Sequence, residues 1–407
     1  MTTLSVVIPA YNEESGIADI VQRVLDIQEG LISVNVQDLE LLVVDDGSSD
    51  DTAQIVNDII EHEANVELVS HVNNRGYGAA LKTGFCQARG ELVGFLDADG
   101  TYPPEYFPAL CEAALNGADL VVGSRMAGQE SDMPVVRRVG NLFFANLLSL
   151  LGRQRVTDSA SGMRVFNKDI LDRIYPLPDG LNLTPVMSTR AVHEGVQVAE
   201  VPIPYSERVG RSKLSVVRDG SLFLQSMLWT GLTYNPVRIL GLIGLAGMAL
   251  SIFILLGIAM LRLQGVTSLG PWGVVALFTA AVAGFAGFSI FTLGISFNYL
   301  VSLFYKKPIR QGLFGRQLLS VPLDRHFWWA GGLAILLGLS LGLFALSNGT
   351  RVWELTRLWF YLLGSAMLII TGIQLIIYWI QMRVLEELSA RDDLIGQELQ
   401  NQEKVPV

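Results

Sequence analysis

The sequence predicts an α/β domain with a mostly parallel sheet, followed by a region of four transmembrane helices. Two observations lead to this prediction. Between residues 1 and 125, short aliphatic runs alternate with stretches of helical pattern, which is typical of a parallel sheet covered by helices on both faces. Beyond residue 236, four uncharged stretches each reach the roughly 20 residues that a helix needs to cross a bilayer.

Five short runs are expected to be strands: Leu4–Pro9, Leu41–Val44, Val66–Ser70, Leu92–Leu96 and Leu120–Val122. Helices are expected around 14–27, 51–63, 78–88 and 104–116. Polar clusters follow the first, second and fourth strands, and ligands of parallel sheets bind at the carboxyl ends of strands. The sequence contains no GxxxxGKS/T motif, and no GxGxxG follows the first strand, so a P-loop is excluded and a dinucleotide site is disfavoured.

The charge is distributed unevenly along the chain. Residues 1–120 hold 4 Lys or Arg against 21 Asp or Glu, whereas residues 121–236 hold 13 against 10. A modest basic charge that borders membrane segments argues against a nucleic-acid binder and suits an enzyme that faces anionic lipid or a phosphorylated substrate. The two cysteines, Cys86 and Cys111, have no metal-site spacing, which favours a reducing compartment.

The four stretches expected to span the membrane are Ile239–Leu261, Trp272–Tyr305, Phe327–Ser347 and Leu358–Met382. The connection 306–326 carries more basic residues than the connections on the other side: Lys306, Lys307, Arg310, Arg316 and Arg325 against Arg262, Arg351 and Arg357. Basic loops face the cytoplasm, so 306–326, residues 1–236 and the tail 383–407 are expected there. The N-terminus lacks a signal-peptide pattern, which predicts the same side.

The apolar segment Val135–Leu151 has helical spacing but is too short to cross a bilayer. Basic residues flank it, so we expect a helix that lies in the membrane interface, with an ordinary core helix as the alternative. A second interfacial helix is expected over 213–236.

Two carboxylates, Asp97 and Asp99, follow the fourth predicted strand and are separated by one residue. Like charges this close repel unless a cation compensates them, and oxygen ligands suit Mg²⁺ or Mn²⁺. Thr101 adds a further oxygen, and Asp46 follows the second strand nearby. This arrangement predicts a divalent-metal site at the edge of the sheet.

A set of motifs in this order resembles family 2 glycosyltransferases of the GT-A fold, which use nucleotide-sugar donors. The resemblance covers about residues 4–232 and includes two later motifs that are similar to the polyprenyl-phosphate branch, such as dolichol-phosphate mannose synthases and undecaprenyl-phosphate glucosyltransferases. The segments that carry it are Ser5–Glu14, Val44–Ser48, Asn74–Gly78, Asp97–Asp99, Gly123–Arg125, Ser161–Arg164 and Arg208–Leu214.

The resemblance implies roles for residues on the donor side. Asp99 is the expected direct metal ligand and a catalytic residue, and Asp97 contacts the ribose or the metal through water. Other expected donor-binding residues are Pro9, Tyr11, Glu13, Asp46, Arg75, Ala98 and Lys82. Lys82 has an equally weighted alternative as an ordinary surface residue of its helix. The segment Gly180–Pro185 is expected to line the sugar pocket.

On the acceptor side, the forked guanidinium group of arginine suits a lipid phosphate. The candidates are Arg125, Arg137, Arg208, Arg211 and Lys213, with Arg208 also expected to be catalytic. The alternative for Arg137 and Arg138 is that they contact only lipid headgroups. Asp158 matches an aspartate proposed as a base, and its alternative is a structural acid that pairs with Arg164.

The predicted function is metal-assisted, inverting transfer of a hexose from a UDP- or GDP-hexose to polyprenyl phosphate. One alternative is a processive polysaccharide synthase, although its Gln-x-x-Arg-Trp motif is absent; another is a non-enzymatic scaffold or flippase with a degenerate transferase head. The expected parts are 1–134 for nucleotide-sugar binding, 135–236 for the acceptor side, 237–382 for the spans and 383–407 as a tail. No nucleic-acid partner is expected, and a homo-oligomer is compatible with the sequence.

Overall fold

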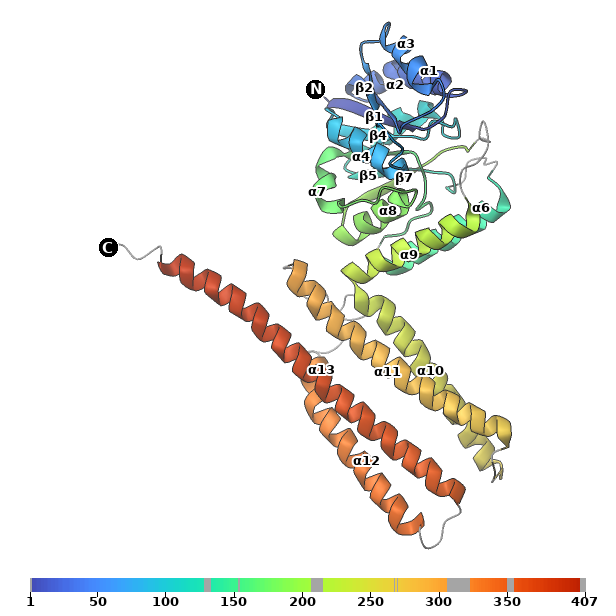
Figure 1. The fold of residues 1–407 in the computed structure, drawn as a ribbon, viewed down its shortest axis with the longest axis vertical. Helices are drawn as coiled ribbons and strands as arrows, with labels where there is room; N and C mark the ends of the chain where they lie inside the picture. The colour runs from blue at the N-terminus through green and yellow to red at the C-terminus, as the bar shows by residue number, and fades with distance from the viewer. Residues whose placement is uncertain are drawn as a thin grey trace. The chain divides into compact units, whose positions relative to one another are not determined.

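The computed structural model describes residues 2–127, 133–152, 154–205, 215–266, 268, 270–305, 323–349 and 355–402. The chain divides into two compact units, Met1–Gly231 and Leu232–Val407 (Figure 1). The four-part division expected from the sequence stays a prediction. The connections 306–322 and 351–354, on which the predicted membrane orientation largely depends, lie outside the described residues.

The first unit is built on a seven-stranded sheet with the order β3-β2-β1-β4-β6-β5-β7. All neighbours are parallel except β6, which runs antiparallel to β4 and β5. The prediction of a mostly parallel sheet is therefore confirmed, with β6 and β7 as unpredicted additions. The strands are β1 Thr2–Ala10, β2 Val36–Asp45, β3 Val66–Ser70, β4 Leu92–Phe95, β5 Leu120–Ser124, β6 Arg164–Asn167 and β7 Val198–Pro202.

Helices cover both faces of the sheet. Alternate residues of β1 point to opposite sides, so Val6 and Ile8 pack with α1 and α5 while Val7 packs with α4 and α8. The helices of this part are α1 Ile17–Leu25, α2 Gln28–Ser33, α3 Thr52–Ile60, α4 Tyr77–Gln87, α5 Phe107–Leu115, α7 Leu171–Ile174 and α8 Leu183–Glu194, with short 3-10 turns at Pro104–Tyr106 and Lys168–Ile170.

Two longer helices complete the first unit. The helix α6 spans Val135–Leu151, the bounds expected from its apolar spacing, and α9 spans Val216–Tyr234. They pack together where the rings of Phe144 and Phe223 lie 6.0 Å apart and where Leu148 and Met227 share a small core. The outer face of α6 leaves six large apolar side chains exposed: Val135, Val136, Val139, Leu142, Phe143 and Leu150.

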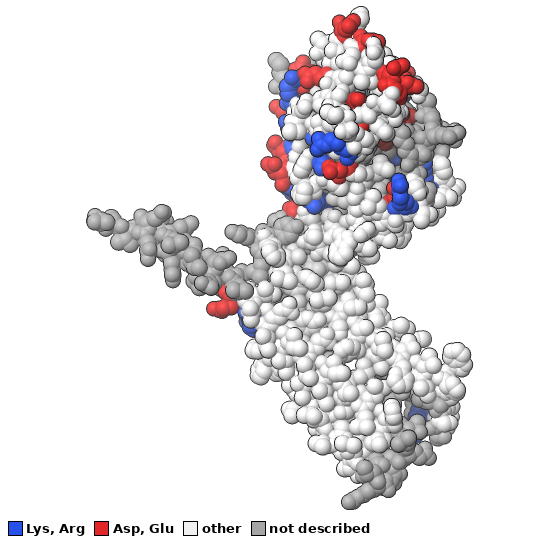
Figure 2. Space-filling view, in the orientation of Figure 1, with Lys and Arg blue, Asp and Glu red and all other residues white. Residues whose placement is uncertain are grey.

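The second unit contains four helices that are long and apolar enough to cross a membrane. They are α10 Pro236–Leu263, α11 Pro271–Tyr305, α12 Phe327–Gly349 and α13 Leu355–Gln402, with a 3-10 turn at Leu323–His326 before α12. The helices pair as α10 with α11 and α12 with α13 (Figure 1). Charged side chains gather on the first unit, while the visible, described surface of the four helices is nearly free of them (Figure 2).

Close helix packing in this unit depends on small residues. A Cβ atom at Gly244 of α10 would lie 2.5 Å from the carbonyl oxygen of Gly287 on α11, so the two backbones meet directly. The hydroxyl of Ser289 on α11 donates a hydrogen bond of 3.0 Å to Gln374 Oε1 on α13. The four spans predicted from the sequence thus correspond to four packed helices.

Candidate active site

A cavity of about 400 Å³ opens at the carboxyl edge of the sheet, beyond the ends of β1, β2 and β4. We call it the strand-end cavity. It brings together many of the side chains singled out in the sequence, which come from segments more than 100 residues apart. Its lining consists of Pro9, Ala10, Tyr11, Glu13, Asp46, Asn74, Gly76, Tyr77, Ala80, Asp97, Ala98, Asp99, Thr101, Tyr102, Arg125, Arg137, Ala160, Gly180, Leu181 and Tyr205.

The two carboxylates after β4 are held by hydroxyl groups. The Tyr77 hydroxyl donates to Asp97 Oδ1 at 2.7 Å, and the Thr101 hydroxyl donates to Asp99 Oδ1 at 2.6 Å. Burial, and then the charge of Asp97, raise the pKa of Tyr77 well above its ordinary value, so the phenol keeps the proton that it donates. These bonds fix both carboxylates at the cavity wall.

A glycine packs directly against one of these carboxylates. A Cβ atom at Gly162 would lie 2.5 Å from Asp97 Oδ2, closer than atoms approach without displacement. The Gly162 N–H also donates to the Tyr102 hydroxyl at 2.7 Å. Gly162 therefore leaves the room that the Asp97 side chain occupies.

The donor set fits a hard divalent cation. Two carboxylates and the Thr101 oxygen offer oxygen ligands only, and Mg²⁺ is usually held by one or two carboxylates together with substrate phosphates. Within the described part of the chain, no group of three His, Cys, Asp or Glu side chains forms a complete protein cage for a metal. The arrangement suits a cation that is shared with a bound diphosphate.

Asp46 anchors the loop that leads into α4. Its carboxylate accepts hydrogen bonds from the Arg75 and Gly76 N–H groups at 2.9 and 2.8 Å, and it lies 2.7 Å from His71 Nδ1. His71 Nε2 lies 2.9 Å from the Thr83 hydroxyl on α4. Asp46 therefore lines the cavity and also holds the loop that forms this side of it.

Arg125 reaches the cavity from the end of β5 in a buried ion pair with Asp158. Its guanidinium lies 5.6 Å from the ring centres of both Tyr102 and Tyr205. Burial alone would raise the pKa of Asp158, but the charge and hydrogen bonds of Arg125 outweigh burial and lower it. Burial alone would lower the pKa of Arg125, but Asp158 outweighs burial and the pKa is raised. Both groups therefore remain charged.

Arg164, the alternative partner for Asp158, makes different hydrogen bonds. Its Nε and Nη2 groups donate to the carbonyl oxygens of Ser161 and Ser159 at 3.1 and 3.0 Å. Burial lowers its pKa to about 10. The ion pair of Asp158 is thus with Arg125, while Arg164 holds the loop that precedes β6.

The predicted acceptor-side residues divide into two groups. Arg125 and Arg137, the latter on α6, line the strand-end cavity. Arg208, Arg211 and Lys213 lie in 206–214, outside the described residues, so their predicted roles stay predictions.

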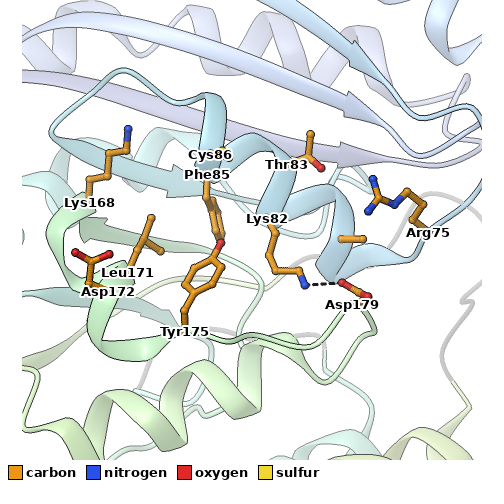
Figure 3. A pocket seen from close by; sticks show the side chains of 11 residues that line it. Arg75, Lys82, Thr83, Phe85, Cys86, Lys168, Leu171, Asp172, Tyr175 and Asp179 are labelled. Atoms are coloured by element: carbon orange, nitrogen blue, oxygen red, sulfur yellow. Dashed lines mark ion pairs between the residues drawn. The ribbon is translucent and has the colours of Figure 1, made fainter.

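Two predicted donor-side cations lie elsewhere. Arg75 and Lys82 line a second cavity of about 660 Å³ beside α4, which we call the α4 cavity (Figure 3). Lys82 Nζ lies 2.5 Å from Asp179 Oδ1 and donates to the Leu177 carbonyl oxygen at 2.9 Å. Neither cation lines the strand-end cavity.

Sequence reasoning singled out Tyr11 of the site but gave no role to three other tyrosines. Tyr77, Tyr102 and Tyr205 line the cavity, and the first two hold Asp97 and Gly162. The proximity of Tyr102 to the acidic pair and of Tyr77 to the glycines was the available signal. No local pattern pointed to Tyr205, because its place in the site depends on its contact with Arg125, which is distant in the sequence.

Comparison with known proteins identifies families for both parts of the chain. Residues 5–175 match Glycosyl transferase family 2, and residues 236–396 match a domain of unknown function, DUF8752. A dolichyl-phosphate hexose transferase of Haloferax volcanii is 32% identical over 229 residues, which are 55% of this chain and 92% of the relative. An undecaprenyl-phosphate 4-deoxy-4-formamido-L-arabinose transferase of Klebsiella pneumoniae is 30% identical over 328 residues, 78% of this chain and 94% of the relative.

Among solved structures, glucosyl-3-phosphoglycerate synthase from Mycobacterium tuberculosis is similar to this chain. The structure, in complex with Mn²⁺, uridine diphosphate and phosphoglyceric acid, has a TM-score of 0.45 and 22% sequence identity. It covers 56% of this chain and 78% of that protein.

The α/β fold, the family match and the two curated relatives define a membrane-associated glycosyltransferase. The chain belongs to glycosyl transferase family 2. The two curated relatives are named for transfer to polyprenyl phosphates, so the expected resemblance to that branch is confirmed. The four apolar helices make the chain a multi-pass membrane protein.

Proposed function

We propose that this enzyme transfers a hexose from a UDP- or GDP-hexose to a polyprenyl phosphate. One observation carries the proposal: the acidic pair Asp97 and Asp99 and the basic residues Arg125 and Arg137 line the same cavity. An acidic pair suits a metal-bound diphosphate, and fixed guanidinium groups suit a second phosphate. The names of both curated relatives, which act on dolichyl or undecaprenyl phosphate, agree with this acceptor.

On the donor side, Asp97, Asp99 and Thr101 would hold Mg²⁺ or Mn²⁺. The cation would supply stabilisation of the negative charge that develops on the leaving diphosphate. Tyr77 and Thr101 keep the two carboxylates in place through their hydroxyl groups. Asp46, with Pro9, Tyr11, Glu13 and Ala98, would form the wall around the nucleoside.

On the acceptor side, Arg125 and Arg137 would bind the lipid phosphate and orient it for in-line attack, with inversion at the sugar carbon. A phosphate oxygen is already anionic near neutral pH and needs no general base. The lowered pKa of Asp158 and its bond to Arg125 support a role for Asp158 in holding Arg125 in place. A base role for Asp158, and phosphate contacts from Arg208, Arg211 and Lys213, stay predictions.

The first unit carries a surface that suits the membrane interface. The exposed apolar face of α6 lies beside Arg137 and the exposed Arg138, and α9 adds the exposed side chains of Val217 and Trp229. Amphipathic helices with basic flanks insert their apolar face at headgroup depth, where a lipid phosphate lies. This surface would bring the acceptor phosphate to the strand-end cavity.

The catalytic domain would face the cytoplasm, because the basic connection 306–326 faces that side by the positive-inside rule. Cysteine labelling in intact cells tests this orientation. A cysteine at Ser347 is expected to react with an impermeant thiol reagent, whereas one at Gln311 is expected to be protected. The opposite pattern would refute the cytoplasmic assignment.

A donor screen tests the proposed substrates. Purified full-length protein in detergent is incubated with Mg²⁺ or Mn²⁺, polyprenyl phosphate and radiolabelled UDP- or GDP-hexoses. Label is expected to enter the organic phase with at least one hexose donor and only when polyprenyl phosphate is added. Incorporation of label into a water-soluble polymer would instead favour a processive synthase, and no transfer from any donor would favour a degenerate transferase head.

A further inference from the structure

The segment 177–182 forms a thin wall between the two cavities. Gly180 and Leu181 line the strand-end cavity, while the neighbouring Asp179 lines the α4 cavity (Figure 3). The position of this wall therefore contributes to the shape of the strand-end cavity. Some of the side chains that hold the wall in place, Lys82 among them, line the α4 cavity.

The wall is docked on the first turn of α4. The Gly78 and Ala79 N–H groups donate to the Asp179 carbonyl oxygen at 2.7 and 3.1 Å. A Cβ atom at Gly78 would lie 2.2 Å from the carbonyl oxygen of Pro178, so only glycine permits this approach. These two hydrogen bonds join the wall to the helix at one carbonyl oxygen.

Lys82, one turn further along α4, adds two side-chain contacts to the wall. Its ammonium group pairs with the Asp179 carboxylate at 2.5 Å and donates to the Leu177 carbonyl oxygen at 2.9 Å. Figure 3 shows the Lys82 side chain directed at Asp179. One side chain thus fixes two points of the wall, and its side chain is only 26% exposed.

The other end of the wall is held from the opposite side. The Asn182 side-chain amide donates to the Ser226 hydroxyl of α9 at 2.7 Å. Helix α9 packs on α6, which supplies Arg137 to the cavity. The wall therefore lies between α4, whose Tyr77 holds Asp97, and the α6–α9 pair on the acceptor side.

The geometry points to Lys82 as a positioning residue for the transferred sugar. In the proposed complex the sugar would lie between the diphosphate and the acceptor phosphate, and Gly180 and Leu181 line the cavity that would hold both. Lys82, acting through Asp179 and Leu177, holds this wall against the sugar and thereby sets sugar affinity and selectivity. The inference rests on the proposed function, and it gives Lys82 no direct contact with the nucleotide.

Calorimetry on the full-length protein in detergent, with Mn²⁺, tests this role. The probes are UDP and GDP on one hand and a panel of UDP- and GDP-hexoses on the other. Lys82→Met is expected to weaken binding of the preferred nucleotide-hexose about three- to tenfold, as loss of a partly exposed ion pair and its ordering would. Binding of the nucleoside diphosphate is expected to stay within about twofold, and discrimination between epimeric hexoses is expected to narrow.

Further variants separate this effect from misfolding. Asp179→Asn is expected to reproduce the change, and the double variant is expected to be no worse than either single variant, because both act through one contact. Lys82→Arg is expected to restore part of the selectivity. Lys168→Met is the matched control, since Lys168 lies in the same cavity but donates to the Ala88 carbonyl oxygen at the far end of α4.

Two results would overturn the inference. Equal loss of nucleoside-diphosphate and nucleotide-hexose affinity in Lys82→Met would mean that Lys82 supports binding of the nucleotide. Unchanged binding and selectivity in both single variants would mean that the Lys82–Asp179 ion pair has no effect on sugar binding. Because donor binding needs no acceptor, a wild-type protein that binds donors but transfers nothing to lipid would refute the proposed function while leaving this comparison decisive.

Discussion

Arg125 and Asp158 form a buried, two-point ion pair, with Arg125 Nε 2.7 Å from Asp158 Oδ2 and Arg125 Nη2 2.8 Å from Asp158 Oδ1. Only Arg125 lines the strand-end cavity, so Asp158 acts on the cavity through its partner. The two tyrosine rings beside the guanidinium complete the setting. This pair links the loop before β6 to the proposed phosphate-binding side of the site.

The first prediction concerns Asp158→Asn, which leaves the buried Arg125 charge without its anionic partner. Breaking a buried pair in this way costs about 3–5 kcal/mol, so we expect a clear loss of unfolding free energy. Transfer is expected to fall mainly through a higher KM for polyprenyl phosphate. The exposed Asp172 provides the control, and Asp172→Asn is expected to keep both properties. A fully stable Asp158→Asn enzyme with a lower kcat alone would instead support a base role.

The same pair predicts a pH dependence of stability. Arg125 lowers the folded-state pKa of Asp158 below its ordinary value of 3.8, against the effect of burial. The stabilisation is therefore fully present above that ordinary value and is lost as the pH falls through the folded-state pKa. The difference in unfolding free energy between wild type and Asp158→Asn is expected to be flat near neutral pH and to shrink below pH 3.8. A difference that grows on acidification would contradict the assignment.

The third prediction concerns Gly162→Ala. The added Cβ atom would lie 2.5 Å from Asp97 Oδ2 and would displace the carboxylate. We expect the Mn²⁺ concentration for half-maximal transfer to rise about tenfold, as for loss of one charge-assisted contact. Gly220→Ala on α9, where no atom lies within 4 Å of the added carbon, is the matched control. An unchanged metal dependence in Gly162→Ala would remove Asp97 from the metal site.

The fourth prediction compares two adjacent arginines on α6. Arg137 lines the strand-end cavity, whereas Arg138 is exposed and does not line it. Loss of one phosphate contact costs about 1.5–3 kcal/mol, so Arg137→Ala is expected to raise the apparent KM for polyprenyl phosphate roughly ten- to a hundredfold. Donor binding is expected to change little. If both variants weaken lipid dependence equally, Arg137 contacts headgroups only, and its place in the acceptor site is wrong.

Much of the fold was predictable because local patterns determine it. The strands between Leu4 and Val122 are recognisable in the sequence as aliphatic runs, and the apolar spacing of 135–151 gives the bounds of α6. The strand β6 was not predictable, since its four residues become a strand only by pairing between β4 and β5. Helix α8 was missed because it is buried nearly all round, polar residues such as Thr189 included, so it has no amphipathic face.

The candidate site shows the same division. Asp46, Asp97 and Asp99 were predictable because the carboxyl ends of parallel strands meet at one edge. The partner of Asp158 was not, because Arg125 is 33 residues away along the chain and Arg164, nearer in sequence, bonds to carbonyl oxygens instead. The place of Lys82 depends on Asp179 in a distant segment, so its helix alone could not reveal it.

The central claim is that the strand-end cavity transfers sugar to a lipid phosphate with the help of a cation held by Asp99. The most direct measurement is the initial rate at which radiolabelled hexose passes from its nucleotide donor into the organic phase, for wild type, wild type in EDTA, and Asp99→Asn. We expect both EDTA and Asp99→Asn to lower the rate at least about a hundredfold, with restoration of the EDTA-treated enzyme by Mg²⁺ or Mn²⁺. Full transfer in EDTA, or an unimpaired Asp99→Asn enzyme, would contradict the account.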